Sequence, residues 1–201
     1  MDKYVKKYAK LYRNALKEQG FSDIDTMTES YEKKLENMYA SGAYKAHDVY
    51  PTINTSLVYA VIAMCLELKE KGLSNQQILD FSDCVFRKRK KAFAILEKLI
   101  DRLPNAYKIA EKWNINDHEN RVRDGSITYD VFDVEDGRIE YRISKCNYVA
   151  MFDYYGIRPL CKIFCRTDES AYANLTAKVR FTRYSDLSDG ECCHDVIERK
   201  R

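Results

Sequence analysis

The chain of 201 residues contains few residues that interrupt regular structure, with only seven glycines and three prolines. It has no internal repeat, Gly/Ser-rich linker or low-complexity tract, so we expect one domain over residues 1–201. A long apolar run is also missing. The longest, residues 57–66, is shorter than the roughly 20 residues that a membrane-spanning helix needs, and it predicts a buried helix. No apolar stretch typical of a secretion signal follows Met1, so we expect a cytoplasmic protein.

The chain also lacks a strong excess of either charge. Its 34 Lys and Arg residues and 31 Asp and Glu residues give a formal net charge of +3. This balance does not predict a nucleic-acid partner, and the missing apolar run gives no reason to expect a membrane partner. Five consecutive basic residues at positions 87–91 are either an anion-binding patch or a solvated helix surface. The sequence identifies no cofactor, and it leaves a homo-oligomer open.

The first half of the chain repeats its apolar residues at helical spacing. Residues 3–19 place them on one face, and Gly20 is a natural helix stop. Ser74 and Gln77 have the spacing of a capping box, which predicts that a helix begins there and continues toward Ile100. Further helices are predicted at residues 26–39 and 54–71 and, as a short helix, from Pro104 to Trp113, with a connector at residues 43–51.

The pattern changes to a two-residue period near Asn120. Residues 127–134 and 138–144 alternate around Asp136-Gly137, a pair typical of a hairpin turn. Two more strands are predicted at residues 178–184 and 191–198, the second after a turn at Asp189-Gly190.

Helices first and strands later indicate an α+β fold. We expect a helical part over residues 1–116, packed on an antiparallel sheet formed within residues 126–198. One helix should lie between the second and third strands, within residues 145–175.

The seven cysteines are an odd number with no regular spacing, so we expect free thiols. Cys65 and Cys84 lie in helical apolar stripes and are interpreted as packing residues. His47 and His118, each beside an aspartate, are interpreted as surface residues. The other five cysteines gather within fifty residues, together with Asp168, His194 and Asp195: Cys146, Cys161, Cys165, Cys192 and Cys193.

Three interpretations of this cluster remain open. The first is nucleophilic catalysis, for which a thiol needs a nearby cation or base such as His194 or Arg183. The second is zinc binding, although zinc ligands usually form closer pairs than Cys161 and Cys165, and no metal ligand is assigned. The third is simple packing of buried thiols. If residues 192–195 form a strand, Cys193 and Asp195 face one side of it, and Cys192 and His194 face the other.

The C-terminal residues also form an ordered series of short motifs over residues 140–196. The series consists of Cys146-Asn147-Tyr148, Phe152, Tyr155-Gly156, Phe164-Cys165-Arg166-Thr167-Asp168, Val179-Arg180-Phe181-Thr182-Arg183, Gly190 and Cys192-Cys193-His194-Asp195. It resembles the L-2-amino-thiazoline-4-carboxylic acid hydrolase family, which shows a Cys, a Gly, a Cys-x-x-Asp, a Phe-x-Arg strand and a closing Gly and Cys-Asp. The closing element departs from this pattern, since either Cys193 or His194 takes the place of the family's cysteine.

The resemblance implies a hydrolase that opens a carbon–nitrogen bond of a small cyclic amidine carrying a carboxylate. Such a substrate needs an arginine for its carboxylate, a nucleophile for its amidine carbon and a proton for its leaving nitrogen. From residue type we assign Cys165 as nucleophile, Asp168 as acid and base, and Arg183 as the carboxylate partner. His194 is assigned as a third catalytic residue. Further substrate-binding residues are assigned as Cys146, Cys193 and Asp195.

In a rival hypothesis, the protein has the same fold and cysteines but no catalytic activity. It would then be a small-ligand-binding or thiol-sensing domain. The two hypotheses differ in geometry. An enzyme should bring Cys165, Asp168 and Arg183 together at one pocket, whereas separate packing sites would favour the rival. A small-molecule partner is expected in either case.

Overall fold

A computed structural model describes residues 2–41 and 52–200 of the chain, so the predicted connector and His47 lie outside the described residues. The chain divides into two compact units. The first consists of residues 1–87 and 151–160, and the second of residues 88–150 and 161–201. The single domain that the sequence predicts stays a prediction.

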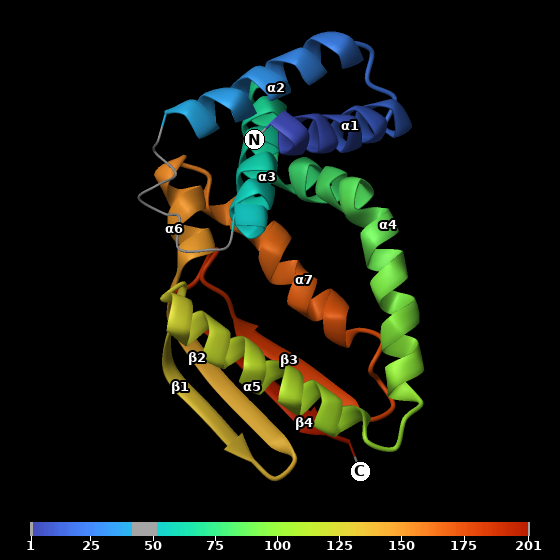
Figure 1. Cartoon of the computed structure of the whole chain (residues 1–201), viewed down its shortest axis with the longest axis vertical. Helices are drawn as coiled ribbons and strands as arrows, with labels where there is room; N and C mark the ends of the chain where they lie inside the picture. The colour runs from blue at the N-terminus through green and yellow to red at the C-terminus, as the bar shows by residue number, and fades with distance from the viewer. Residues whose placement is uncertain (1, 42–51, 201) are drawn as a thin grey trace. The chain divides into compact units, whose positions relative to one another are not determined.

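The first unit is built from helices (Figure 1). Its core is formed by side chains that are almost wholly buried, and the rings of Tyr12 and Tyr31 lie 4.7 Å apart between centroids. Leu16, Leu35 and Ile62 are also fully buried. The helices are α1 (Asp2–Glu18), α2 (Ile24–Ala40), α3 (Thr52–Glu70), the first half of α4 (Asn75–Asp101) and the end of α6 (Asn147–Tyr154).

The capping box predicted at the start of α4 is present. The backbone N–H of Gln77 donates to Ser74 Oγ at 3.3 Å, and the backbone N–H of Ser74 donates to Gln77 Oε1 at 2.8 Å. These bonds satisfy two backbone donors that the first turn of a helix leaves unpaired. The helix continues to Asp101, one residue beyond the predicted apolar pattern.

The second unit contains a four-stranded antiparallel sheet in the order β1-β2-β4-β3. Gly137 closes the first hairpin with φ at +85°, a conformation that strongly favours glycine. Gly190 is required for another reason, because a Cβ there would lie 2.9 Å from the backbone oxygen of Asp186. The strands are β1 (Ile127–Glu135), β2 (Arg138–Cys146), β3 (Val179–Ser185) and β4 (Cys193–Arg199).

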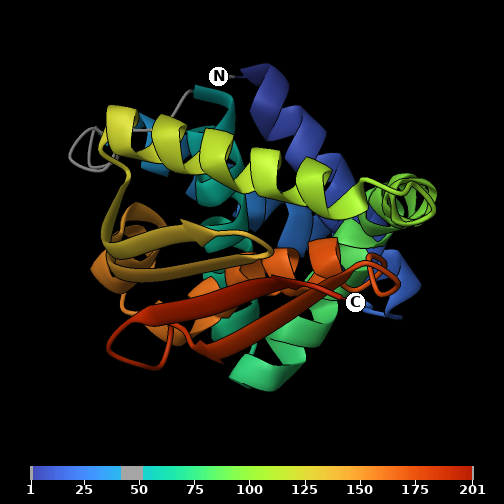
Figure 2. The same cartoon turned by 90° about the horizontal axis from the view of Figure 1, so that it is seen from below.

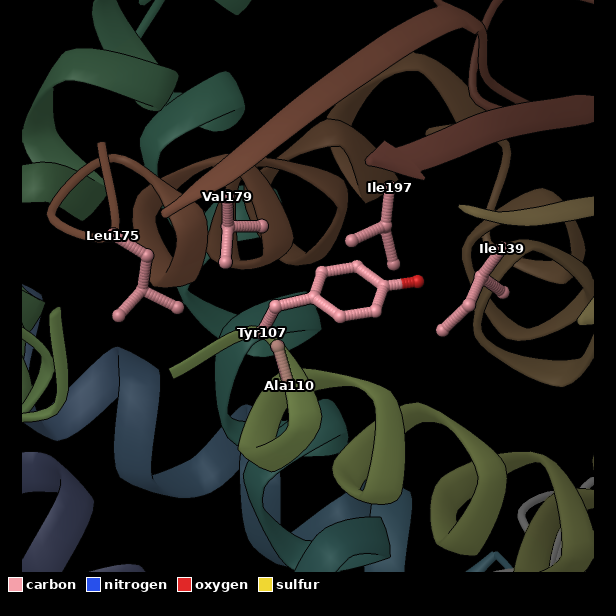
Figure 3. Close-up of a cluster of buried hydrophobic side chains, with 6 residues drawn as sticks. All are labelled: Tyr107, Ala110, Ile139, Leu175, Val179 and Ile197. Atoms are coloured by element: carbon pink, nitrogen blue, oxygen red, sulfur yellow. The ribbon is translucent and has the colours of Figure 1, made fainter. Parts of the chain in front are cut away.

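Two helices of the second unit, α5 (Ala106–Asp124) and α7 (Lys162–Tyr172), lie on one side of this sheet (Figure 2). Tyr107 and Ala110 of α5 pack on strand residues and on Leu175 (Figure 3). This apolar cluster fixes α5 across the sheet, and the strand residues in it are Ile139, Val179 and Ile197.

The second half of α4 is tied to the segment that leads into β3. Asp101 accepts hydrogen bonds from the backbone N–H groups of Ala177 and Lys178, at distances of 2.9 to 3.3 Å. Glu97 accepts one from Asn174 Nδ2 at 2.8 Å. Charged acceptors therefore hold the loop between α7 and β3, where no regular ladder satisfies the backbone.

The predicted α+β class is confirmed, with helices before the sheet and more helix between β2 and β3. That intervening helix is in fact two helices, α6 (Asn147–Tyr154) and α7, separated by the 3-10 turn η2 (Arg158–Cys161). The short helix predicted from Pro104 to Trp113 is wrong in length, because α5 extends to Asp124. Its polar second half contains no apolar period that would have revealed it.

Candidate active site

One face of α5 changes from apolar to polar along its length. Asn114, Asp117, His118 and Arg121 follow the spacing i, i+3, i+4 and i+7, so they share a helix face. Asn114 Nδ2 donates to the hydroxyl of Tyr172 on α7 at 2.6 Å. The polar half of α5 thus lies over the same side of the sheet as α7.

The ring of His118 is held by aromatic side chains of β1. It stacks on Phe132 with centroids 3.7 Å apart and meets Tyr129 edge-on at 4.6 Å. Burial lowers the pKa of His118, and the negative charges of Glu119 and Asp117 offset part of that shift. The surface position that the sequence suggested is therefore only partly right, since His118 is half-buried and packed on the sheet.

Arg183 of β3 stands at the centre of the polar contacts. Its Nε and Nη2 donate to the two carboxylate oxygens of Asp195 on β4, both at 2.7 Å. Nη2 also donates to Asp168 Oδ2 at 3.0 Å, and Nη1 donates to the backbone oxygen of Cys165 at 2.6 Å. These contacts use four of the five N–H groups of the guanidinium and join two strands to α7.

The pair of Arg183 and Asp195 is buried, with 9% and 1% of the side-chain surface exposed. Burial would lower the pKa of Arg183, but the hydrogen bonds and charge of Asp195 raise it, and the guanidinium stays charged. Tyr141, paired with Asp195 across the strands, adds a hydrogen bond to the same carboxylate. Asp195 therefore serves as a fixed internal counter-ion.

Asp168 differs from Asp195 in its exposure, because 52% of its side-chain surface remains open. The part of the carboxyl that packs against the protein loses hydration, which raises its pKa to about 6 despite the opposing attraction of Arg183. A carboxyl that titrates near neutrality and is open to solvent can both accept and donate a proton.

Four thiols lie close to one another near the start of α7: Cys146, Cys161, Cys165 and Cys193. Cys161 hydrogen-bonds to Cys165 one helical turn later, and its pKa is raised by that bond and by burial. Burial also raises the pKa of Cys146, and it raises the pKa of Cys193 to about 12. Cys161, Cys146 and Cys193 therefore stay protonated at neutral pH, and all seven cysteines are free thiols as predicted.

Irregular strand pairing occurs next to two of the site residues. The register of β1 and β2 shifts on either side of Tyr129, and that of β3 and β4 shifts between Arg183 and Ser185. A bulge re-aims the neighbouring side chain and raises the local twist. The irregular pairing of β1 leaves both Tyr129 and Phe132 against His118 of α5, and burial, together with the charges of Asp117 and Asp168, raises the pKa of Tyr129. Arg183 lies before its register shift and follows the regular alternation that puts it on the same face as Phe181.

His194 lies on the opposite face of the sheet. Its Nε2 is 2.9 Å from Glu140 Oε1, and its ring lies 4.8 Å from the exposed ring of Tyr184. Arg138 also bonds Glu140, and that bond lowers the pKa of the carboxyl. Strand alternation therefore separates His194 from Asp195, as the sequence predicted for a strand at this position.

The structure thus brings together six of the seven predicted site residues: Cys146, Cys165, Asp168, Arg183, Cys193 and Asp195. His194 is the residue that it separates from them. Sequence reasoning missed the contribution of α5, although the spacing of its four polar residues was visible. It also missed the tyrosines around the carboxylates, namely Tyr129, Tyr141, Tyr148 and Tyr172.

The fold and the site define a class of protein, an α+β domain with thiols, carboxylates and guanidiniums gathered between two helices and a sheet. A family model described as L-2-amino-thiazoline-4-carboxylic acid hydrolase matches residues 54–196, which is more than half of the chain. The chain belongs to this hydrolase family, as its C-terminal motifs suggested. Comparison with curated proteins gives no match.

No group of three or more His, Cys, Asp or Glu side chains within residues 2–41 and 52–200 is arranged to hold a metal ion. Over the same part of the chain, no helix has the length and apolar character needed to cross a bilayer.

Proposed function

We propose that the protein hydrolyses a small cyclic amidine that carries a carboxylate, with 2-amino-thiazoline-4-carboxylate as the first substrate to test. Family membership supports the reaction class. The observation that carries the proposal is the placement of Asp168 on α7, one turn after Cys165, half-exposed and with a pKa of about 6.

The proposed reaction consumes one water. The Cys165 thiol, deprotonated by Asp168, attacks the amidine carbon, and Asp168 returns the proton to the ring nitrogen as the carbon–nitrogen bond breaks. Water then releases the enzyme-bound carbon. Its oxygen becomes the new carbonyl oxygen, and the departing ring nitrogen ends as an amine. If the thiol does not attack, Asp168 instead activates water for direct addition to the same carbon.

Arg183 takes a different role in this proposal from the one that the sequence suggested. Its bidentate face already holds Asp195, so a substrate carboxylate would have to displace a buried counter-ion. We therefore assign Arg183 as a positioning residue that holds Asp168 and the backbone of Cys165 in one place. His194, on the other face of the sheet, has no part in the mechanism.

One observation bears on the rival thiol-sensing function. A cluster of four thiols would suit a sensor, but the reactive species is the thiolate. Burial keeps the pKa of Cys146 and Cys193 high, and the hydrogen bond to Cys165 together with burial keeps that of Cys161 high. A sensor should lose thiols within minutes in dilute hydrogen peroxide, with its ligand affinity changing in step. An enzyme of the proposed kind should turn over a thiazoline without any oxidant.

The experiment follows the purified protein with 2-amino-thiazoline-4-carboxylate and identifies the product. Cleavage of the carbon–nitrogen bond releases a primary amine and keeps the substrate sulfur bonded to carbon. Cleavage of the carbon–sulfur bond releases a thiol instead. Equimolar thiol in the product would contradict the assignment of Asp168 as proton donor to the ring nitrogen, and no ring opening at all would contradict the proposed function.

A further inference from the structure

The second half of α4 has large apolar side chains on its exposed side (Figure 1). Five of them are between 42% and 64% exposed: Phe93, Ile95, Leu96, Leu99 and Leu103. Neighbouring members are three or four residues apart, so they form one apolar stripe along the helix and the turn that follows it. In the first half of the same helix, Ile78 and Phe81 are buried. A contiguous exposed apolar surface is typical of an interaction site.

The acidic residues of this segment face the protein. Residues 88–103 contain two acids, Glu97 and Asp101, which are four residues apart and share a helix face. Both carboxylates accept hydrogen bonds from the segment between α7 and β3, and Glu97 is only 2% exposed. Ile95 and Leu99 are each two residues from Glu97, which is about half a helical turn. The acids and the centre of the apolar stripe therefore lie on opposite sides of α4.

The basic residues of the segment lie beside the apolar stripe. Lys91, Lys98 and Arg102 are exposed, and they recur seven and four residues apart, so they line one flank of the stripe. The sequence places three further basic residues at positions 88–90, in the helical turn before the stripe. The outward side of the segment thus combines apolar side chains with positive charge, while its two acids are bonded to the protein.

We propose that this side of α4 binds an anionic lipid surface, with the apolar stripe at the boundary of headgroups and acyl chains and the basic flank against the headgroups. Such a helix lies in the plane of the surface and does not span it, so it needs no long apolar run. Charge complementarity selects this occupant, because anionic headgroups attract clustered Lys and Arg side chains. A second copy of the chain fits less well, since pairing through this side would bring two basic flanks together.

The test measures co-sedimentation of the full chain with vesicles of phosphatidylcholine alone and of phosphatidylcholine mixed with phosphatidylserine. The wild-type protein should bind the mixed vesicles at least about tenfold more tightly, and added salt should weaken this binding by screening the charges. The stripe variant, Ile95→Gln with Leu99→Gln, should bind about tenfold or more weakly. The flank variant, Lys98→Gln with Arg102→Gln, should lose about fivefold per charge. All four side chains are exposed, so both variants should fold.

Matched controls come from exposed positions of α5: Trp113→Gln with Val122→Gln for the stripe, and Lys112→Gln with Arg123→Gln for the flank. Both should bind vesicles as the wild type does, and circular dichroism checks that every variant is folded. Equal binding to the two kinds of vesicle, or undiminished binding by the folded stripe variant, would overturn the proposal. A wild type that binds neither vesicle would also overturn it. A dimer that the stripe variant abolishes would then assign the stripe to a second copy. Vesicle binding is measured without turnover, so the result is independent of the proposed function.

Discussion

Asp168 and Asp195 share one guanidinium but have opposite environments. Asp195 is enclosed and bidentate, whereas Asp168 makes one contact and remains half-open to solvent. The same residue type thus provides a structural counter-ion at one position and a titratable group at the other. In the mechanism that we propose, this difference makes Asp168, and not Asp195, the group that exchanges protons with the substrate.

The raised pKa of Asp168 predicts a specific dependence of stability on pH. Since the carboxyl titrates near 3.8 when unfolded and at about 6 when folded, its protonated form favours the folded state. That contribution is complete below pH 3.8 and is lost as the pH rises to about 6. Urea unfolding of wild-type and Asp168→Asn protein at pH 4, 5, 6 and 7 should therefore show the wild type losing stability relative to the variant between pH 4 and 6. A constant difference would contradict the raised pKa.

Removing the internal counter-ion should destabilise the fold. Asp195→Asn leaves the buried charge of Arg183 without its bidentate partner, and breaking such a pair costs about 3–5 kcal/mol. Urea unfolding at pH 7 measures the change in free energy of unfolding. Asp133→Asn is the control at an exposed position of β1 and should change stability by less than about 0.5 kcal/mol. Equal effects of the two substitutions would contradict the structural role of Asp195.

At the scale of secondary structure, α4 and α5 illustrate what the sequence could and could not predict. The start of α4 was predictable because a capping box is a local signal of two residues. The second half of α5 could not be predicted in this way, because the face that it turns toward the sheet is polar. Asn114 and His118 contact Tyr172 and the rings of β1, partners that are more than ten residues away along the chain. A helix that presents polar groups to a site gives no apolar period.

The same reasoning applies to the strands. The hairpin at Asp136-Gly137 was predictable from turn chemistry, whereas the bulges at Tyr129 and after Arg183 were not. A bulge depends on which residues face each other across the strands, and the sequence does not give that register. Alternation still predicted correctly that Cys193 and Asp195 would share a face without His194.

The capping box gives a prediction for α4. Ser74→Ala removes the acceptor for the backbone N–H of Gln77 and should lower the free energy of unfolding by about 1 kcal/mol. Thermal or urea unfolding measures the change. Ser22→Ala is the control, because Ser22 is exposed and its hydroxyl donates to the carboxylate of the neighbouring Asp23. A neutral Ser74→Ala variant would show that the cap contributes nothing to stability.

At the scale of the whole molecule, the site lies within the second compact unit. Every residue assigned to it falls within residues 88–150 or 161–201. The order of elements was predictable from the change in period, but the position of this boundary was not, since α4 contributes to both units. Sequence periodicity predicts where a helix or strand begins and ends, but it does not predict which hydrophobic core that element packs into.

The redox state of the whole chain is a further prediction. All seven cysteines should react with an alkylating reagent after denaturation without reductant, because each is a free thiol in the structure. Mass spectrometry counts the added groups. A protein with two or three bridges, and correspondingly fewer alkylated thiols, would contradict this expectation.

We propose that Cys165 and Asp168 on α7 form the reacting pair of a ring-opening hydrolase. The most direct measurement is turnover of 2-amino-thiazoline-4-carboxylate by wild type, Cys165→Ser and Asp168→Asn, with Cys192→Ser as the control thiol. Wild type and Cys192→Ser should open the ring. Turnover should fall by at least about a thousandfold in Cys165→Ser and by about 100- to 10,000-fold in Asp168→Asn. Undiminished turnover in either α7 variant, or none in the wild type, would contradict this pairing.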